Sequence, residues 1–184
     1  MKHKEMPNVY FFSGPCGCGK TTLSNAFAKH LVNDIGKNQV YIIHGDDIRG
    51  GFVDSDNADK YSEGKLPWSE ILKFNWECIL NTLESALQRG LDVVVDYVIE
   101  EELPLVKGIA EKYGADFYYI VLTASEEEIR RRITERGDTW LIDRAFFLKN
   151  KLDSMPENQG HLFDNTDMTV EEELKLLDIE KYII

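Results

Sequence analysis

A glycine-rich segment near the beginning of the chain, residues 14–22, reads G-P-C-G-C-G-K-T-T. It fits the spacing G-x-x-x-x-G-K-[ST]. The apolar run at residues 9–12 is typical of a buried parallel strand, and from residue 20 to 35 apolar side chains recur at helical spacing. A strand, a tight glycine-rich loop and a helix are therefore expected in that order, and this unit is typical of α/β folds.

A loop of this kind binds phosphate groups for physical reasons. Glycines let the backbone curl so that successive N–H groups point inward at phosphate oxygens, and the following helix adds the positive end of its dipole. Lys20 would place its charge on the β- and γ-phosphates of a nucleotide, and the Thr21 hydroxyl would reach Mg²⁺. The alternative is a turn that merely joins a strand to a helix. The nucleotide-binding residues predicted here are Gly14, Pro15, Cys16, Gly17, Cys18, Gly19, Lys20, Thr21 and Thr22.

Length and charge narrow the class of protein further. The 184 residues suit a single domain, residues 1–184, and no apolar run is long enough to cross a membrane. Residues 1–8 lack the apolar stretch of a secretory signal, so a cytoplasmic protein is expected. The net charge of −12 argues against long nucleic acid as a partner, because polyanion binders carry a basic stripe. A small anionic ligand remains compatible with this charge, and monomer and homodimer both stay open.

The three cysteines, Cys16, Cys18 and Cys78, indicate neither a disulfide framework nor a zinc site. Their number is odd, and no second pair of ligands follows at zinc spacing. Cys16 and Cys18 occupy variable positions of the glycine-rich loop. The start of the next helix could lower the pKa of a thiol there. Two interpretations therefore stay open: a redox role for these cysteines, or side chains that merely fill space in the loop.

The rest of the chain alternates between strand and helix patterns. Further strands are expected at residues 39–44, 91–96, 116–122 and 161–163. Helices are expected from Pro67 to a C-cap at Gly90, over residues 103–113, from a capping box at Ser125 and Glu128 to about Arg136, over residues 143–152, and from the capping pair Thr169 and Glu172 to about Leu177. Residues 45–66 are polar and predict an irregular loop. The alternation predicts a parallel sheet with helices on both faces and right-handed crossovers.

Ligands of such sheets bind beyond the carboxyl ends of the strands. The segments that directly follow the expected strands are residues 14–22, 44–49, 96–97 and 164–166. Because parallel strands end at the same edge of a sheet, we expect these segments to line one cleft. The candidate carboxylates of the site are found among them.

Residues 44–49 read H-G-D-D-I-R. Asp46 is the first candidate for a base that accepts the proton of an attacking hydroxyl, or for a Mg²⁺ ligand through water, with Asp47 in reserve. Gly45 is expected to let the backbone turn sharply and set Asp46 into the cleft. Alternatively, Asp46 or Asp47 caps the next helical turn. Arg49 would clamp an anionic substrate, or else is an ordinary surface arginine.

Asp96 ends an otherwise apolar strand. A buried carboxylate at the edge of a core needs a partner, and a hydrated Mg²⁺ or a hydroxyl of the phosphate loop would supply one. The position resembles that of a Walker-B acidic residue, so we predict contact with Mg²⁺ or substrate. A strand-end aspartate that binds turn amides is the alternative. His44, at the end of another expected strand, is interpreted as structural.

Helical geometry separates the arginines of the stretch R-R-R-I-T-E-R. At about 100° per residue, Arg132 and Arg136 flank the apolar stripe of their helix, whereas Arg130 and Arg131 are expected in solvent. Guanidinium groups match phosphate oxygens, so we predict that Arg132 and Arg136 contact phosphate. An ion pair with Glu128, four residues earlier, is the alternative for Arg132 and leaves Arg136 unexplained.

Taken in order, these motifs resemble those of the P-loop small-molecule kinases, the group that includes gluconate kinase and shikimate kinase. The resemblance rests on G-P-C-G-C-G-K-T-T, I-I-H-G-D-D, V-V-V-D-Y, R-R-I-T-E-R-G and H-L-F-D-N-T. It is strongest to small bacterial gluconate-kinase-like proteins, also described as AAA-family ATPases. It implies an α/β, three-layer P-loop NTPase fold with a five-stranded parallel sheet in the order 2-3-1-4-5. It also implies a short helical lid at about residues 130–150.

The same resemblance implies ATP with Mg²⁺ as cofactors and a lid that supplies Arg132 and Arg136. It implies adenine packing near Asn165 and Thr166. The metal contacts we predict are Thr21, Asp46 and Asp96. No acceptor follows from it, although residues 50–66 should shape that pocket. An AAA+ assembly is not expected, because the chain lacks the helical second domain of that group.

We therefore expect an enzyme that transfers the γ-phosphoryl group of ATP to a hydroxyl of a small molecule, such as a sugar acid. Lys20, Arg132 and Arg136 would neutralise charge in the transition state, and Asp46 would orient and deprotonate the acceptor. Three alternatives remain open. They are a kinase of nucleotides or nucleic-acid 5′ ends, a toxin-like kinase of a sugar nucleotide or antibiotic, and a nucleotide-binding regulatory protein with little catalysis.

Overall fold

In the part of the chain that the structure describes, the sheet has five strands, and its strand pairs are all parallel, as the alternating pattern predicts. The computed structural model describes residues 6–52 and 66–184. The strands are β1 (Asn8–Ser13), β2 (Val40–His44), β3 (Asp92–Asp96), β4 (Asp116–Thr123) and β5 (Leu162–Asp164). Their spatial order is β2-β3-β1-β4-β5, which confirms the expected topology.

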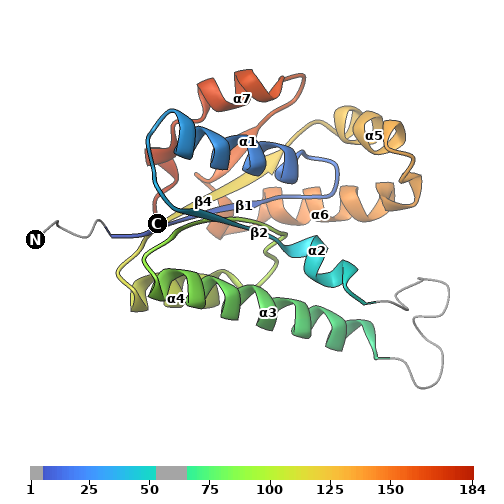
Figure 1. Cartoon of the computed structure of the whole chain (residues 1–184). Helices are drawn as coiled ribbons and strands as arrows, with labels where there is room; N and C mark the ends of the chain where they lie inside the picture. Colours follow the sequence, from blue (N-terminus) through green and yellow to red (C-terminus); the bar gives the residue numbers. More distant parts are fainter. Residues whose placement is uncertain (1–5, 53–65) are drawn as a thin grey trace, which may run out of the picture.

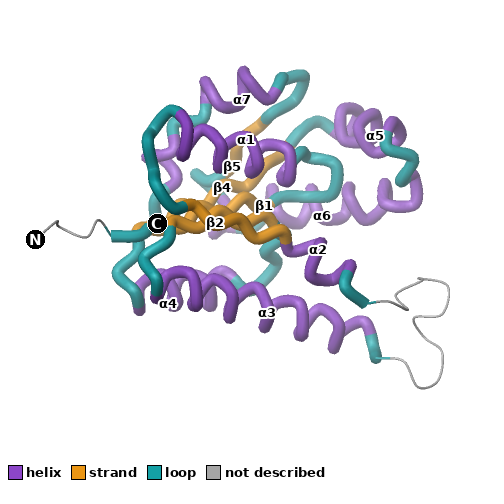
Figure 2. Tube along the Cα trace, viewed as in Figure 1, coloured by secondary structure: helices purple, strands orange, loops and turns teal. Residues whose placement is uncertain are grey.

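Helices cover both faces of this sheet, so the fold has three layers (Figure 2). They are α1 (Lys20–Asn33), α2 (Gly45–Gly50), α3 (Trp68–Gln88), α4 (Leu103–Lys112), α5 (Glu126–Glu135), α6 (Ile142–Ser154) and α7 (Val170–Leu176). Helices α1 and α7 lie over one face, and α3 and α4 lie over the other (Figure 1). The helices α5 and α6 contact each other, with the short 3₁₀ turn Thr139–Leu141 between them.

The central strands are apolar on both sides, which is why they are sandwiched between helices. Phe11 packs toward α3 with Trp76, whereas its neighbour Phe12 packs toward α1 with Phe27. Both phenylalanines are fully buried, and each such side chain contributes about 1.5–3 kcal/mol through burial. The two cores hold the carboxyl ends of β1, β3 and β4 in fixed relative positions.

Several element boundaries differ from the sequence prediction. The first helix ends at Asn33 rather than at Ile35, whose side chain is 58% exposed. The glycine that ends it, Gly36, has φ of 79°, which favours a residue without a side chain. Residues 45–50, predicted as irregular loop, form helix α2. Residues 53–65, and with them most of the segment expected to shape the acceptor pocket, lie outside the described residues.

Among residues 6–52 and 66–184, none of the helices has the length and apolar character that a bilayer crossing requires.

Candidate active site

The glycine-rich loop joins β1 to α1 and is shaped by glycines at positions where a side chain does not fit. Gly14 has φ of 139°, and a Cβ there would lie 2.5 Å from the carbonyl oxygen of Leu122 on β4. Gly17 has φ of 79°, and its Cβ would lie 2.7 Å from Cγ1 of Ile133 on α5. The motif requires Gly14, whereas the need for Gly17 comes from the close approach of α5.

The start of α1 has the features of an anion site. Gly19 is its N-cap, no side chain caps the helix, and its first turn has no acidic residue. The first N–H groups therefore lack a side-chain acceptor, and the helix dipole favours negative charge there. Lys20 sits at this end, where its Nζ donates to the carbonyl oxygen of Pro15 at 2.9 Å. These residues fit a phosphate chain.

Lys20 keeps its charge despite its position. Burial alone would lower the pKa of its ammonium group, but Cys18, Cys16, Asp46 and Asp96 attract the positive charge, and the pKa is raised overall. Asp46 follows β2, and Asp96 ends β3. Three neighbouring strands thus direct charged groups toward one another, as expected for the carboxyl edge of the sheet.

The cysteines of the loop pack against the core and the lid helices. Cys18 is fully buried, and burial raises the pKa of its thiol, contrary to the lowering considered from the sequence. Cys16 packs with Ile129 and Ile133 of α5. The two cysteines thereby join the loop to the core and to the lid helices.

Asp96 pairs with His44, the histidine interpreted as structural from the sequence. Its side chain is 3% exposed, and its Oδ1 lies 2.6 Å from Nδ1 of His44. Burial raises the pKa of Asp96, and hydrogen bonds from Thr21 and His44 oppose part of that rise. The contact to Thr21 agrees with the predicted partnership between Asp96 and a hydroxyl of the phosphate loop.

Gly45 is needed for a different reason from the one predicted. Its backbone is helical, and it belongs to the first turn of α2. A Cβ at this position would lie 2.4 Å from Cδ2 of Tyr97. The tyrosine follows β3 and is itself buried. The chain passes from strand to helix at Gly45, but the glycine is needed because it makes room for an aromatic ring.

The acidic pair after β2 lies on the surface of the site. Asp46 is 62% exposed and forms an ion pair with Arg49, with 3.0 Å between Oδ1 and Nη2. The guanidinium of Arg49 also stacks over the ring of Trp68, 5.5 Å from its centroid. Asp47 is exposed. Asp46 lies in the first turn of α2, where the helix dipole favours a carboxylate. The N-cap is His44 and no side chain caps the helix, so the alternative that Asp46 or Asp47 is a cap is wrong.

Arg132 joins the lid helix to the phosphate loop. Its Nε donates to Glu128 at 2.6 Å, which is the ion pair considered as the alternative. Its Nη1 also donates to the carbonyl oxygen of Cys18 at 3.3 Å and to Oδ1 of Asn165 at 3.2 Å. The ion pair and the approach to the phosphate loop therefore occur together.

The other arginines are placed differently from the prediction. Arg136 is 53% exposed and lies 3.4 Å from Asp138, so it does not flank a buried stripe. Arg131 binds Glu128 through two nitrogens and is half exposed rather than simply solvated. These bonds hold the pKa of Glu128 down at about 2. The side chain of Glu128 is thereby engaged with arginines, and of the predicted capping box the Ser125 half forms, with the Ser125 hydroxyl accepting the backbone N–H of Glu128.

The residues after β5 form hydrogen bonds that support the phosphate loop and the start of α5. The Asn165 side chain is fully buried, and its Nδ2 donates to the carbonyl oxygen of Cys18 at 2.8 Å. Thr166 donates its hydroxyl to Asp164 at 2.6 Å and accepts the backbone N–H of Ser125 at 2.8 Å. The amide of Asn165 is thus engaged within the protein, and the contact of Asn165 and Thr166 with adenine stays a prediction.

The described residues 6–52 and 66–184 contain no preformed cluster of three or more histidine, cysteine or acidic side chains for a metal. Thr21 and Asp96 contact each other and can hold a hydrated Mg²⁺ together with phosphate oxygens. Mg²⁺ keeps several waters and is commonly bound in this way rather than in an all-protein cage. The residues present therefore fit the ion that the resemblance implies.

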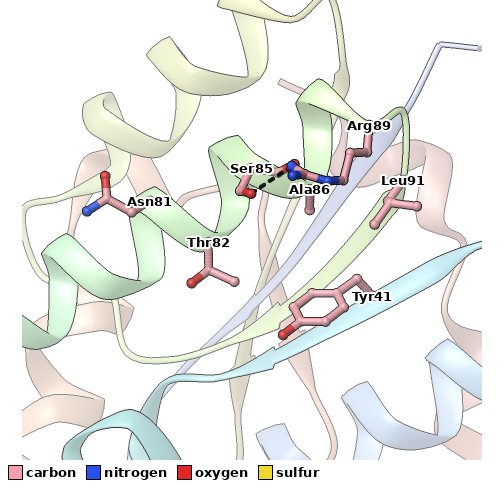
Figure 3. A pocket seen from close by; sticks show the side chains of 7 residues that line it. All are labelled: Tyr41, Asn81, Thr82, Ser85, Ala86, Arg89 and Leu91. Atoms are coloured by element: carbon pink, nitrogen blue, oxygen red, sulfur yellow. Dashed lines mark hydrogen bonds between the residues drawn. The ribbon is translucent and has the colours of Figure 1, made fainter.

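A shallow groove of about 450 Å³ lies away from this site, between β2 and the second half of α3 (Figure 3). It is lined by Tyr41, Asn81, Thr82, Ser85, Ala86, Arg89 and Leu91. None of the predicted site residues is among them.

A glycine cradle at the start of α1, a buried carboxylate at the end of the neighbouring strand and the sheet order define a P-loop NTPase of the kinase type. The chain belongs to the AAA domain family, whose model matches residues 9–157.

Individual relatives agree with this assignment. The guanylate kinase of Geobacter sulfurreducens is 28% identical over 142 residues, a match that covers 70% of this chain and only 65% of the length of that enzyme. The structure of Mycobacterium tuberculosis APS kinase CysC is similar with a TM-score of 0.66 at 20% identity, covering 96% of this chain and 98% of that one. A gluconokinase from Sinorhizobium meliloti 1021 has a TM-score of 0.60 at 18% identity, covering 92% and 89%. The two structures show the shared fold.

Proposed function

We propose that the protein transfers the γ-phosphoryl group of ATP to a hydroxyl of a small anionic molecule. The observation that carries this proposal is the convergence of the loop lysine with two carboxylates. The negative charges of Asp46 and Asp96 both help to raise the pKa of the Lys20 ammonium group. A group that binds phosphate and a group suited to accept a proton therefore share one edge of the sheet.

Each residue has a role that follows from its place. The loop amides and Lys20 bind the phosphates, and Arg132 adds charge from the lid side. Asp46, exposed at the end of β2, orients an acceptor hydroxyl and takes its proton. Bound Mg²⁺, held by Thr21 and through Asp96, would neutralise charge on the phosphates. Arg136 is exposed and lies near the lid turn, from which it could reach the transferred group.

Arg49 supports an anionic acceptor. Its guanidinium is held by Asp46 and by stacking on Trp68, yet 37% of its side chain is exposed. A fixed, partly exposed guanidinium suits a carboxylate or phosphate group on the incoming molecule. Sugar acids carry such a group, and so do nucleoside monophosphates.

A nucleoside monophosphate is the second candidate acceptor, and the sequence similarity to guanylate kinases favours it. A screen for ADP release decides between the candidates. Sugar acids, neutral sugars, nucleosides, nucleoside monophosphates and aminoglycosides would each be supplied with ATP and Mg²⁺. Release with one anionic class and not with its neutral analogues supports the proposal. ATP binding without ADP release for any acceptor would contradict it and favour a regulatory protein.

A further inference from the structure

The carboxyl-terminal helix α7 places a buried carboxyl group behind the phosphate loop. Glu173 is 4% exposed, and α7 packs against α1, the helix that begins at the loop. Its Oε1 accepts a hydrogen bond from Nδ2 of Asn165 at 2.9 Å. In the sequence Glu173 is one of a run of acidic residues, E-E-E, and only its burial distinguishes it from Glu171 and Glu172, which are exposed.

The amide of Asn165 connects this carboxyl group to the loop. Its Nδ2 donates both to Glu173 and to the carbonyl oxygen of Cys18. Its Oδ1 and its backbone oxygen both accept from Arg132, at 3.2 and 2.9 Å. Rotation of the amide by half a turn would set oxygen against oxygen at Glu173 and Cys18. The Oε1 atom of Glu173 accepts from Nδ2, so Glu173 favours the orientation in which the NH₂ end of the amide faces the loop.

The orientation of the Cys18 carbonyl determines what the loop offers to a phosphate. In a trans peptide the C=O of one residue and the N–H of the next point in opposite directions. When the Cys18 carbonyl is held toward Asn165, the N–H of Gly19 is turned away from Asn165. Gly19 is the N-cap of α1, directly before Lys20, where inward N–H groups form an anion-binding concavity.

We propose that Glu173 is a positioning residue for nucleotide binding. Through Asn165 it holds the Cys18–Gly19 peptide and the guanidinium of Arg132 in the orientation that phosphate needs. This inference rests on the proposed function, since it assumes a nucleotide phosphate in the loop. It assigns to α7, which lies beyond the residues 9–157 matched by the family model, a part in that site.

Calorimetric titration with ATP and Mg²⁺, without an acceptor, tests the proposal. Glu173→Leu removes the hydrogen-bond acceptor, Glu173→Asp withdraws it by one methylene, and Glu173→Gln keeps an acceptor oxygen. The matched controls are Glu171→Leu and Glu171→Gln on the exposed side of the same helix. All proteins are measured at a temperature at which circular dichroism shows them folded, and Glu173→Asp decides if Glu173→Leu does not fold.

We expect the Kd to rise about tenfold in Glu173→Leu and Glu173→Asp, as for the loss of one buried hydrogen bond. Glu173→Gln and the Glu171 controls should bind like the parent protein. A residue that only stabilised the fold would lower the melting temperature without changing the Kd of the folded protein. Unchanged Kd in all Glu173 variants overturns this inference alone. A parent protein that fails to bind nucleotide overturns the proposed function and the inference with it.

Discussion

His44 and Asp96 are register partners in the adjacent strands β2 and β3, and their side chains meet at 2.6 Å. The next residues of the two strands, Gly45 and Tyr97, also contact each other, because the tyrosine ring occupies the space of the missing side chain. The parallel pairing of β2 and β3 thus sets both the buried carboxylate and the start of α2. The phosphate side and the acceptor side of the site are connected through these two pairs.

Removal of the charge at Asp96 should weaken metal-dependent nucleotide binding. We expect Asp96→Asn to reduce the effect of Mg²⁺ on ATP affinity strongly, and His44→Gln to reduce it less, since the histidine acts only through Asp96. Burial raises the pKa of Asp96. As the pH falls, Asp96 therefore becomes neutral at a higher pH than an ordinary aspartate does. Titrations with and without Mg²⁺ measure this effect, and an Asp96→Asn protein with the parent's Mg²⁺ dependence would contradict it.

Gly45→Ala should destabilise the fold through a steric clash. The new methyl group would meet the ring of Tyr97, and overpacking of this kind costs about 1–3 kcal/mol. Gly108→Ala is the matched control, because it lies within α4 with no atom within 4 Å of the added Cβ. That change should be neutral or stabilising by up to about 1 kcal/mol. Urea unfolding measures the free energy of unfolding of the two variants. Equal values would contradict the close approach of the Tyr97 ring to Gly45.

Asp46→Asn should lower kcat and leave the affinity for ATP nearly unchanged. The side chain is exposed at the acceptor side, and its proposed task is to accept a proton during transfer. A loss of about 10²–10⁴-fold is typical when such a group is removed. Asp116→Asn, at the opposite end of the sheet, serves as control. A kcat equal to that of the parent protein would contradict the role of Asp46 as a base. Asp46 would then only interact with the dipole of α2.

The buried carboxyl of Glu173 should make stability depend on pH. Burial raises its pKa to about 7, while hydrogen bonding from Asn165 and the charge of Arg132 oppose the rise. A raised pKa in the folded state means that the stabilising contribution is complete below the unfolded value of 4.5 and is lost as the pH rises to about 7. At 1.36 kcal/mol per pKa unit the loss is about 3 kcal/mol.

Glu173→Gln cannot ionise and isolates this contribution. Compared with the variant, the parent protein should lose unfolding free energy between pH 4.5 and 7, as measured by urea unfolding across that range. Parallel pH curves for the two proteins would show that the carboxyl group does not titrate as its burial implies.

The elements with strong periodicity were predictable from the sequence. The phosphate loop follows from its spacing, and the sheet order followed from the resemblance of the ordered motifs. Contacts between residues distant in the sequence were not predictable. The need for a glycine at position 45 depends on Tyr97, and the need for one at position 17 depends on Ile133. No local pattern shows either neighbour.

The arginines show a second limit of sequence reasoning. Angles around a helix placed Arg132 and Arg136 beside one stripe, yet Arg136 lies at the end of α5 as its C-cap and turns toward Asp138. Helical periodicity no longer describes side chains once the helix has ended. The role of Asn165 was missed because a buried amide with several partners has no sequence signature of its own.

Nucleotide binding by the loop around Lys20 is measured most directly by calorimetric titration of the parent protein and Lys20→Ala with ATP and Mg²⁺. Lys29→Ala, an exposed lysine on the same helix, is the control. We expect the parent and the control to bind alike, and Lys20→Ala to bind about a hundredfold more weakly while its circular dichroism stays unchanged. A parent protein that binds no nucleotide, or a folded Lys20→Ala protein that binds as tightly as the parent, would contradict the proposed site.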